Sequence, residues 1–407
     1  MGKIYIPMGD FLKNAGIVGM HYILDEIAEA SENMDYGYTE DNQQLWIDTD
    51  FCQKTNWTDL YFRGITTYYR QNSVYQTILD KIKSLLTALS LPEWDGKKWK
   101  DDIKFINDKL LSNSYKSGIA SIKDEVDTTE AYELLKAVKL KESMEPELLR
   151  ERLVHLHEFL IQPVCAETLI MKSAIYNYIN RFWDGKCFLL RANAAKNMRE
   201  VFENDFSDPF RTYIETDQKK AKEICIDCSA KIDSKTKVSL AFMKDQADDL
   251  ARKQSAFWNC KVDAFLCPVC AFVYALSPLG FYLMGNRFLF INTDQNIQEL
   301  LEANRKDGVM QDAEREDEER YTSWISRTLN LLLKMKTEEL GNIQVITRGR
   351  DESERYTFDI INKNILAILN DEKVRAGLDV LSKYPYIKKG TEYINIHETV
   401  ILNILRD

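Results

Sequence analysis

Two Cys-x-x-Cys hooks constrain the fold of this chain more than any other feature of its sequence. Cys225 and Cys228 form the first hook, and Cys267 and Cys270 form the second after a long intervening loop. Each hook is a tight turn that presents two thiolates in one direction, and Pro268 presets the geometry of the second turn. Structural zinc takes four such ligands at the corners of a tetrahedron. The sequence therefore predicts one structural zinc ion held by all four cysteines.

Other interpretations of the cysteines stay open at this point. Cys-x-x-Cys is also the spacing of thiol-exchange enzymes, and the two hooks could be unrelated reduced thiols. Cys260, near the second hook, is either a buried spare thiol or a substitute ligand. The first residues lack a basic stretch followed by an apolar one, so we expect neither a secretory signal nor a disulfide framework. Two hooks in one chain favour a metal site over redox chemistry.

Length and charge restrict the kind of partner that this chain can bind. With 407 residues it is too long for one ordinary core, and we expect two or three domains. Its formal net charge is −10. A protein that grips nucleic acid unaided usually has a basic balance, so such binding must here use local patches or basic partners. The most apolar stretch, residues 265–285, contains two prolines and is predicted to be buried core, not a membrane span.

The hydrophobic pattern predicts an α+β fold that is mainly helical. We expect a mixed N-terminal domain over residues 1–216, an inserted zinc-binding unit over 217–285, and, over 286–407, a strand that returns to the main body followed by a helical C-terminal region. Strands are expected at 3–8, 38–51 and 286–293, and a turn at Asp184-Gly185. Helices are expected at 10–30, 72–89, 131–143, 146–164, 239–254, 321–340, 356–371 and 397–407. Residues 305–321 are nearly all charged and predict a solvated helix or a linker.

These features together resemble the CXXC–CXXC family of CRISPR-associated proteins. The resemblance rests on the long-spaced hooks, on "CPVC" ahead of an apolar run, and on an N-terminal strand leading into "GDFLKNAGIVGM". The segment "RFWDGKCFLLRANAAKNMREVF" is also similar to a family segment in which an aromatic residue and Lys-x-Phe-Leu precede a polar helix. The chain departs from the family where Gly9-Asp10-Phe11 replaces Gly-Asn-Pro-like text. Many family members also extend further, into a helical bundle that resembles the small subunit.

The resemblance implies the non-catalytic large subunit of a type I-B Cascade surveillance complex in the cytoplasm of a prokaryote. Such a subunit recognises the protospacer-adjacent motif in duplex DNA, aids strand separation and offers a landing surface for the helicase-nuclease. The implied partners are guide RNA-bound backbone subunits, a separate small subunit, target double-stranded DNA and the helicase-nuclease, with no membrane. Base pairing to the guide reads the sequence in such complexes, so an acidic subunit is tolerable.

Several basic and amide side chains are candidates for DNA contact, although each also has an ordinary structural explanation. They are Lys13 and Asn14 at a strand-to-helix turn; Lys97, Lys98 and Lys100 beside two tryptophans; Asn193, Lys196, Asn197 and Arg199 on a polar helix; and Asn286 and Arg287. For the first three groups the favoured explanation is structural: helix-start chemistry, a solvated loop anchored by its tryptophans, and a polar helix face. No group is specific by itself.

No catalytic motif stands out, and the sequence therefore predicts no enzyme. His-Glu-x-x-His and Gly-x-Ser-x-Gly are both absent from the chain. One alternative is an autonomous zinc-containing DNA-binding regulator, which would need a basic recognition helix; residues 239–254 have nearly balanced charge instead. Another is a nucleic-acid enzyme whose catalytic carboxylates are scattered along the chain.

Overall fold

The chain folds into two compact units whose segments alternate along the sequence. The computed structural model describes residues 2–127, 129–194, 196–244, 264–284, 287–293, 295–305, 343–349, 355–361, 363–383, 386–389 and 392–406. Unit 1 comprises Met1–Thr55, Tyr213–Val238 and Phe265–Asp407, and unit 2 comprises Asn56–Thr212 and Ser239–Ala264. The predicted boundaries, after residues 216 and 285, differ from this division because residues 56–212 form the body of a separate unit. Local sequence patterns do not tell which distant segments pack together.

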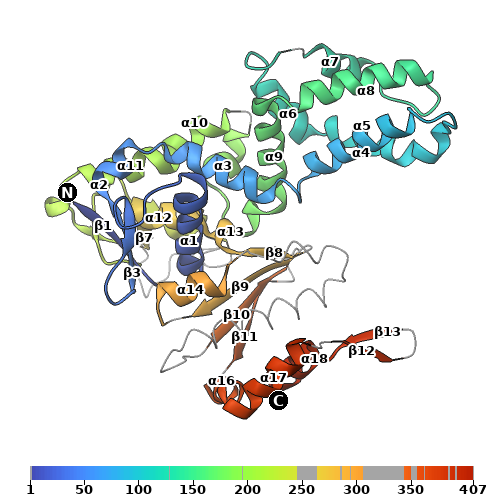
Figure 1. Cartoon of the computed structure of the whole chain (residues 1–407). Helices are drawn as coiled ribbons and strands as arrows, with labels where there is room; N and C mark the ends of the chain where they lie inside the picture. The colour runs from blue at the N-terminus through green and yellow to red at the C-terminus, as the bar shows by residue number, and fades with distance from the viewer. Residues whose placement is uncertain are drawn as a thin grey trace. The chain divides into compact units, whose positions relative to one another are not determined.

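A three-stranded antiparallel sheet and one helix form the N-terminal part of unit 1 (Figure 1). The strand order is β1 (Lys3–Pro7), β3 (Gln44–Asp48) and β2 (Tyr36–Tyr38). Helix α1 (Phe11–Tyr22) starts at Asp10, whose carboxylate accepts the Lys13 backbone N–H at 2.8 Å. A π-helical turn (Ile23–Ile27) continues α1, and α2 (Thr49–Lys54) follows β3. The strand predicted at 3–8 and the helix predicted at 10–30 are confirmed.

The apolar run that follows the second hook is buried, as the sequence predicted. After β7 (Phe265–Leu266) it forms α12 (Pro268–Ala275) and α13 (Ser277–Gly280). Glycines let α1 lie directly against it, because a Cβ on Gly16 would meet the Val273 carbonyl oxygen at 2.2 Å. A Cβ on Gly280 would meet the Ala15 carbonyl oxygen at 1.9 Å. Among the helices that the structure describes, none is long and apolar enough to cross a membrane.

A four-stranded antiparallel sheet forms the rest of the core of unit 1. Its order is β11 (Tyr356–Ile361), β10 (Ile343–Arg348), β9 (Arg287–Thr293) and β8 (Tyr282–Met284). Its apolar side chains form one buried cluster with those of α14 (Ile297–Ala303), α16 (Lys363–Asn370) and α17 (Glu372–Lys383). The described C-terminal residues form β12 (Tyr386–Lys389), β13 (Glu392–Asn395) and α18 (Ile396–Arg406).

One predicted helix in this region is wrong in its first half. Residues 356–361 form strand β11, and only the second half of the predicted helix, from Lys363 onward, is helical. The segment Tyr-Thr-Phe-Asp-Ile-Ile is rich in aromatic and β-branched residues, which favour strands when a neighbouring strand can pair with them. Strand β10 supplies that pairing, with Val345 opposite Asp359.

Unit 2 is built mainly from helices. They are α3 (Trp57–Tyr69), α4 (Val74–Ala88), α5 (Lys100–Leu110), α6 (Asn113–Ser121), α7 (Glu130–Ala137), α8 (Pro146–Leu160), α9 (Pro163–Asn177) and α10 (Met198–Phe202), with α11 (Asp208–Glu215) ending in unit 1. The side chains of Asn56 and Ser73 cap the starts of α3 and α4. Pro163 was predicted to stop the helix that starts at Pro146, and it begins α9 directly after α8 ends.

Most other local predictions are settled by the described residues. The helices at 72–89, 131–143 and 146–164 are confirmed in their main parts, and Gly185 takes the positive φ of 66° that a turn there requires. The helix predicted at 321–340, most of the helix at 239–254 and of the charged run at 305–321, and Cys260 lie outside the described residues. The fold class, α+β and mainly helical, is confirmed.

Candidate metal centre

The first hook is a tight turn between two very short strands. Strand β4 (Glu223–Ile224) leads into Cys225, and β5 (Lys231–Ile232) follows the turn. The backbone N–H of Cys225 donates to the Ala230 carbonyl at 2.8 Å, and the Ser229 N–H donates to the Cys225 carbonyl at 3.0 Å. Ser229 closes the turn in the left-handed region, at a φ of 60°. The pairing of the strands therefore fixes the direction of both thiols in this hook.

The second hook is the first turn of α12. Cys267 is the residue that caps this helix, and its sulfur accepts the backbone N–H of Cys270 at 3.4 Å. Pro268 occupies the first helical position, where a missing N–H costs nothing, so the helix starts immediately after Cys267. The positive end of the helix favours negative charge on these sulfurs.

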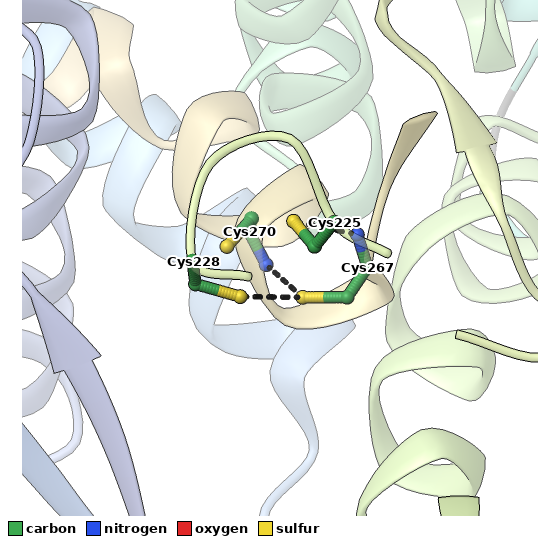
Figure 2. A group of neighbouring side chains, drawn as sticks. All are labelled: Cys225, Cys228, Cys267 and Cys270. Atoms are coloured by element: carbon green, nitrogen blue, oxygen red, sulfur yellow. Dashed lines mark hydrogen bonds between the residues drawn. The ribbon is translucent and has the colours of Figure 1, made fainter. Parts of the chain in front are cut away.

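The two hooks meet through backbone hydrogen bonds as well as through their sulfurs. The N–H of Ile226 donates to the Phe265 carbonyl at 2.9 Å, and the N–H of Cys267 donates to the Cys225 sulfur at 3.2 Å. Figure 2 shows the four side chains converging on one point. All four sulfurs lie within 4.8 Å of one another. The prediction that the hooks form one cluster is therefore confirmed for Cys225, Cys228, Cys267 and Cys270.

The geometry fits a tetrahedral zinc ion. A Zn–S bond of about 2.3 Å places tetrahedral sulfurs about 3.8 Å apart, and the sulfurs of Cys228 and Cys267 are 3.7 Å apart. Cys225, Cys267 and Cys270 are buried and Cys228 is half-buried, and all four are free thiols, not disulfides. Zinc bound by the four thiolates would have a closed coordination shell with no position for a substrate. It would therefore stabilise the turns without taking part in a reaction.

The electrostatics of the cluster call for a cation. Hydrogen bonds from the thiols of Cys228 and Cys267 lower the pKa of Cys225. The same contacts act in the opposite direction on Cys270, whose pKa is raised because a second negative charge would lie beside the first. Four thiolates can therefore coexist here only with a positive ion between them.

A buried ion pair joins α1 to the first hook, and the sequence alone did not reveal it. Lys13 is 1% exposed, and its Nζ lies 2.9 Å from Oδ1 of Asp227, which stands between the two cysteines of the hook. Burial lowers the pKa of Lys13, but the neighbouring Cys270 and Asp227 outweigh burial and raise it, so the ammonium stays charged. Asp10 at the start of α1 also accepts a hydrogen bond from the Tyr274 hydroxyl of α12, at 3.1 Å.

Lys13 and Asn14 do not face solvent, which corrects their selection as DNA contacts. Both side chains are 1% exposed. The Asn14 side chain accepts the Gly9 backbone N–H at 2.9 Å and donates to Asn292 on β9 at 2.8 Å. Both residues therefore hold α1 in place within unit 1, and neither offers a free group to a phosphate or a base.

The lysines beside the two tryptophans remain accessible. Lys97 and Lys98 lie in a single 3-10 turn (Gly96–Trp99), Lys100 starts α5, and all three are exposed. Trp94 and Trp99 are partly buried against the helical core of unit 2. The structural explanation of the tryptophans as anchors therefore holds, while the lysines keep their charge at the surface.

The third candidate group separates into members with different roles. Asn197 caps α10 and Asn193 donates to the Cys187 carbonyl at 3.0 Å, so both amides serve the backbone. Arg199 donates two hydrogen bonds of 2.7 Å to Glu167 and one of 3.2 Å to Asp59, which neutralise its charge. Lys196 is exposed. Of the last pair, Arg287 is exposed at the start of β9, and Asn286 lies outside the described residues.

The fold and the cluster define an α+β protein with four clustered cysteines that could hold a metal ion such as zinc. Residues 218–282, which contain all four cysteines, match the family described as CRISPR-associated protein (Cas_CXXC_CXXC). The match supports a CRISPR-associated protein of the CXXC–CXXC kind, and it covers a minor part of the 407 residues. Comparison with curated proteins and with solved structures gave no match.

Proposed function

We propose that this chain is the non-catalytic large subunit of a type I-B guide-RNA surveillance complex. In this role it recognises the protospacer-adjacent motif in duplex DNA, aids strand separation and helps to recruit the helicase-nuclease. The observation that carries the proposal is the match of residues 218–282 to the CRISPR-associated family, over a segment whose four cysteines lie together in the structure. The proposal extends that family from the matched segment to the whole chain.

The closed metal centre supports a structural role in place of a chemical one. A catalytic zinc site keeps one coordination position open, whereas four cysteine ligands fill the shell. The zinc would hold the first hook, α12 and, through Lys13, the N-terminal helix in one arrangement. Strand cleavage would then belong to the helicase-nuclease partner in the prokaryotic cytoplasm.

The net negative charge of the chain supports nucleic-acid binding that is shared with other subunits. A net charge of −10 does not favour DNA binding by the whole surface. Guide RNA-bound backbone subunits and a small subunit would supply most phosphate contacts, while this subunit contributes a few local lysines. Lys97, Lys98 and Lys100 are accessible for such contacts in unit 2.

Co-expression with neighbouring genes and a CRISPR array, followed by purification on a tag on this chain, tests the proposal. We expect a guide RNA of uniform length and a repeated backbone subunit to co-purify. Recovery of the chain alone, free of RNA, would refute the surveillance-complex assignment and favour an autonomous zinc-containing regulator.

A second experiment addresses DNA contact by the assembled complex. Changing Lys97, Lys98 and Lys100 together to Ala should weaken binding of target duplex and reduce its salt dependence. Unchanged affinity and unchanged salt dependence would remove this turn from the DNA surface.

A further inference from the structure

The outer face of the first hook carries side chains that the metal centre does not use. Exposure alternates along residues 222–226, as expected for an extended segment. Cys225 points into the fold, whereas Lys222, Ile224 and Ile226 are exposed, the two isoleucines to 62% and 58%. Lys231 is the cross-strand partner of Ile224 and is exposed as well.

More lysines surround this stripe. Lys219 and Lys220 lie in a 3-10 turn (Gln218–Lys220) that packs against β5, and Lys235 lies in the turn after β5. We call the exposed set the knuckle face. It consists of Lys219, Lys220, Lys222, Ile224, Ile226, Lys231 and Lys235.

The knuckle face is locally basic in an acidic chain. Two neighbouring lysine–carboxylate pairs neutralise each other: the buried Lys13 with Asp227, and the partly exposed Lys237 with Glu223 at 3.0 Å. Over residues 217–238 this leaves five exposed lysines against two exposed aspartates, Asp233 and Asp217, of which Asp217 pairs with Lys219 at 3.3 Å. The surplus is positive, although the chain as a whole carries −10. Its complement is a polyanion.

The apolar side chains restrict which polyanion fits best. Proteins that hold single-stranded nucleic acid stack its bases on exposed aromatic rings, and residues 217–238, all of which are described, include no exposed aromatic side chain. Aliphatic side chains flanked by cations instead suit the minor groove of duplex DNA, where they contact sugars and base edges between two phosphate walls. Burying two exposed isoleucines there also removes apolar surface from water.

We propose that the knuckle face binds duplex DNA. Its lysines neutralise phosphates, and Ile224 and Ile226 contact the minor groove between them. This inference deepens the proposed function, on which it rests, by naming a DNA-contacting surface that the metal centre itself holds rigid. Zinc would then serve DNA binding indirectly, because Cys225 lies between the two isoleucines.

The test measures binding of a fluorescent duplex to the full-length, zinc-loaded protein over a series of salt concentrations. The variant Lys222→Gln/Lys231→Gln/Lys235→Gln removes three charges from the knuckle face. The control Lys116→Gln/Lys123→Gln/Lys139→Gln removes three exposed lysines from the helices and loops of unit 2. Each lost phosphate contact lowers the slope of log affinity against log salt by about 0.9, so the knuckle variant should lose up to about 2.7 and the control much less. Zinc content and thermal unfolding show that each variant is folded.

The isoleucines are tested by Ile224→Ser/Ile226→Ser, which should weaken duplex binding several-fold and leave the salt slope unchanged. Equal salt slopes for the knuckle variant and the control would overturn the inference, and so would undetectable duplex binding by the wild type at the lowest salt. An equal loss of single-strand binding would overturn the choice of duplex. Co-purification of guide RNA is measured separately, so failure of the knuckle face and failure of the surveillance-complex assignment give different results.

Discussion

The ion pair between Lys13 and Asp227 allows a quantitative test of how α1 is fastened to the metal centre. Lys13 is 1% exposed, Asp227 is 11% exposed, and their charged atoms are 2.9 Å apart. The second carboxylate oxygen of Asp227, Oδ2, is buried and has no hydrogen-bond partner within the described part of the chain. Replacing Lys13 by Met keeps the length and the apolar stem of the side chain and removes the charge. It therefore leaves a carboxylate inside the fold beside four sulfur ligands.

The expected loss can be worked from the pair. At an effective dielectric of about 20, two charges at this separation attract by about 6 kcal/mol, and their desolvation cancels much of that. Removing one partner of a buried pair typically costs about 3–5 kcal/mol, since the other charge stays buried. Asp227 is 11% exposed as a whole, so its charge is less costly than a fully buried one, and we expect a loss of about 3 kcal/mol for Lys13→Met, near the lower end of that range. Removing both charges, in Lys13→Met/Asp227→Asn, should restore all but about 1 kcal/mol.

A double-mutant cycle in the full-length, zinc-loaded protein measures these energies. The free energy of unfolding is followed by amide hydrogen exchange in α1 and the N-terminal sheet, because a chain with two units need not unfold in one step. Zinc affinity is measured in parallel by competition with a chromophoric chelator, and the single variant should bind zinc more weakly. If Asp227→Asn fails to rescue Lys13→Met, the pair does not carry the stability that we assign to it.

Three further predictions concern the metal, the packing of α1 and pH. Cys228→Ser should lose zinc, and its unit 1 should unfold at a lower temperature, since structural zinc contributes about 10–16 kcal/mol of apparent binding energy to small folded sites. Zinc content is measured by atomic absorption, and the control Cys52→Ala, outside the cluster, should keep its zinc. Gly280→Ala should lower the free energy of unfolding by about 3 kcal/mol, because its new methyl group would overlap the Ala15 carbonyl. The control Gly377→Ala, with open space around the new methyl group, should be neutral or stabilising in thermal unfolding. Burial lowers the pKa of His21 in the folded state, so protons bind the unfolded state preferentially and the free energy of unfolding should fall as pH decreases through about 6.5. Denaturant titrations of His21→Gln across that range should show a shallower fall. An identical fall would show that His21 is not the group responsible.

The metal ligands could be identified from the sequence because their chemistry is local. Two cysteines three positions apart in a turn point the same way whatever the rest of the chain does, and Pro268 marks the start of the second turn. The burial of residues 265–284 followed from composition alone, and most helices followed from periodicity and caps. The helix predicted for residues 356–361 was wrong because its true structure is not a local property. These residues form a strand only by pairing with β10.

The roles of the charged residues were decided only by the tertiary structure. The sequence predicted an accessible turn at Lys13 and Asn14, yet both side chains are buried where α1 packs closely against α12 and α13. The sequence predicted that Arg199 could contact DNA, but its guanidinium donates hydrogen bonds to Glu167 and Asp59 on other helices. A side chain's chemical type is fixed by the sequence, but its exposure and partners depend on which distant segments pack against it. For that reason the sequence determined the four-cysteine centre, and the fold determined that the knuckle-face lysines around the first hook face the solvent while Lys13 of α1 is buried.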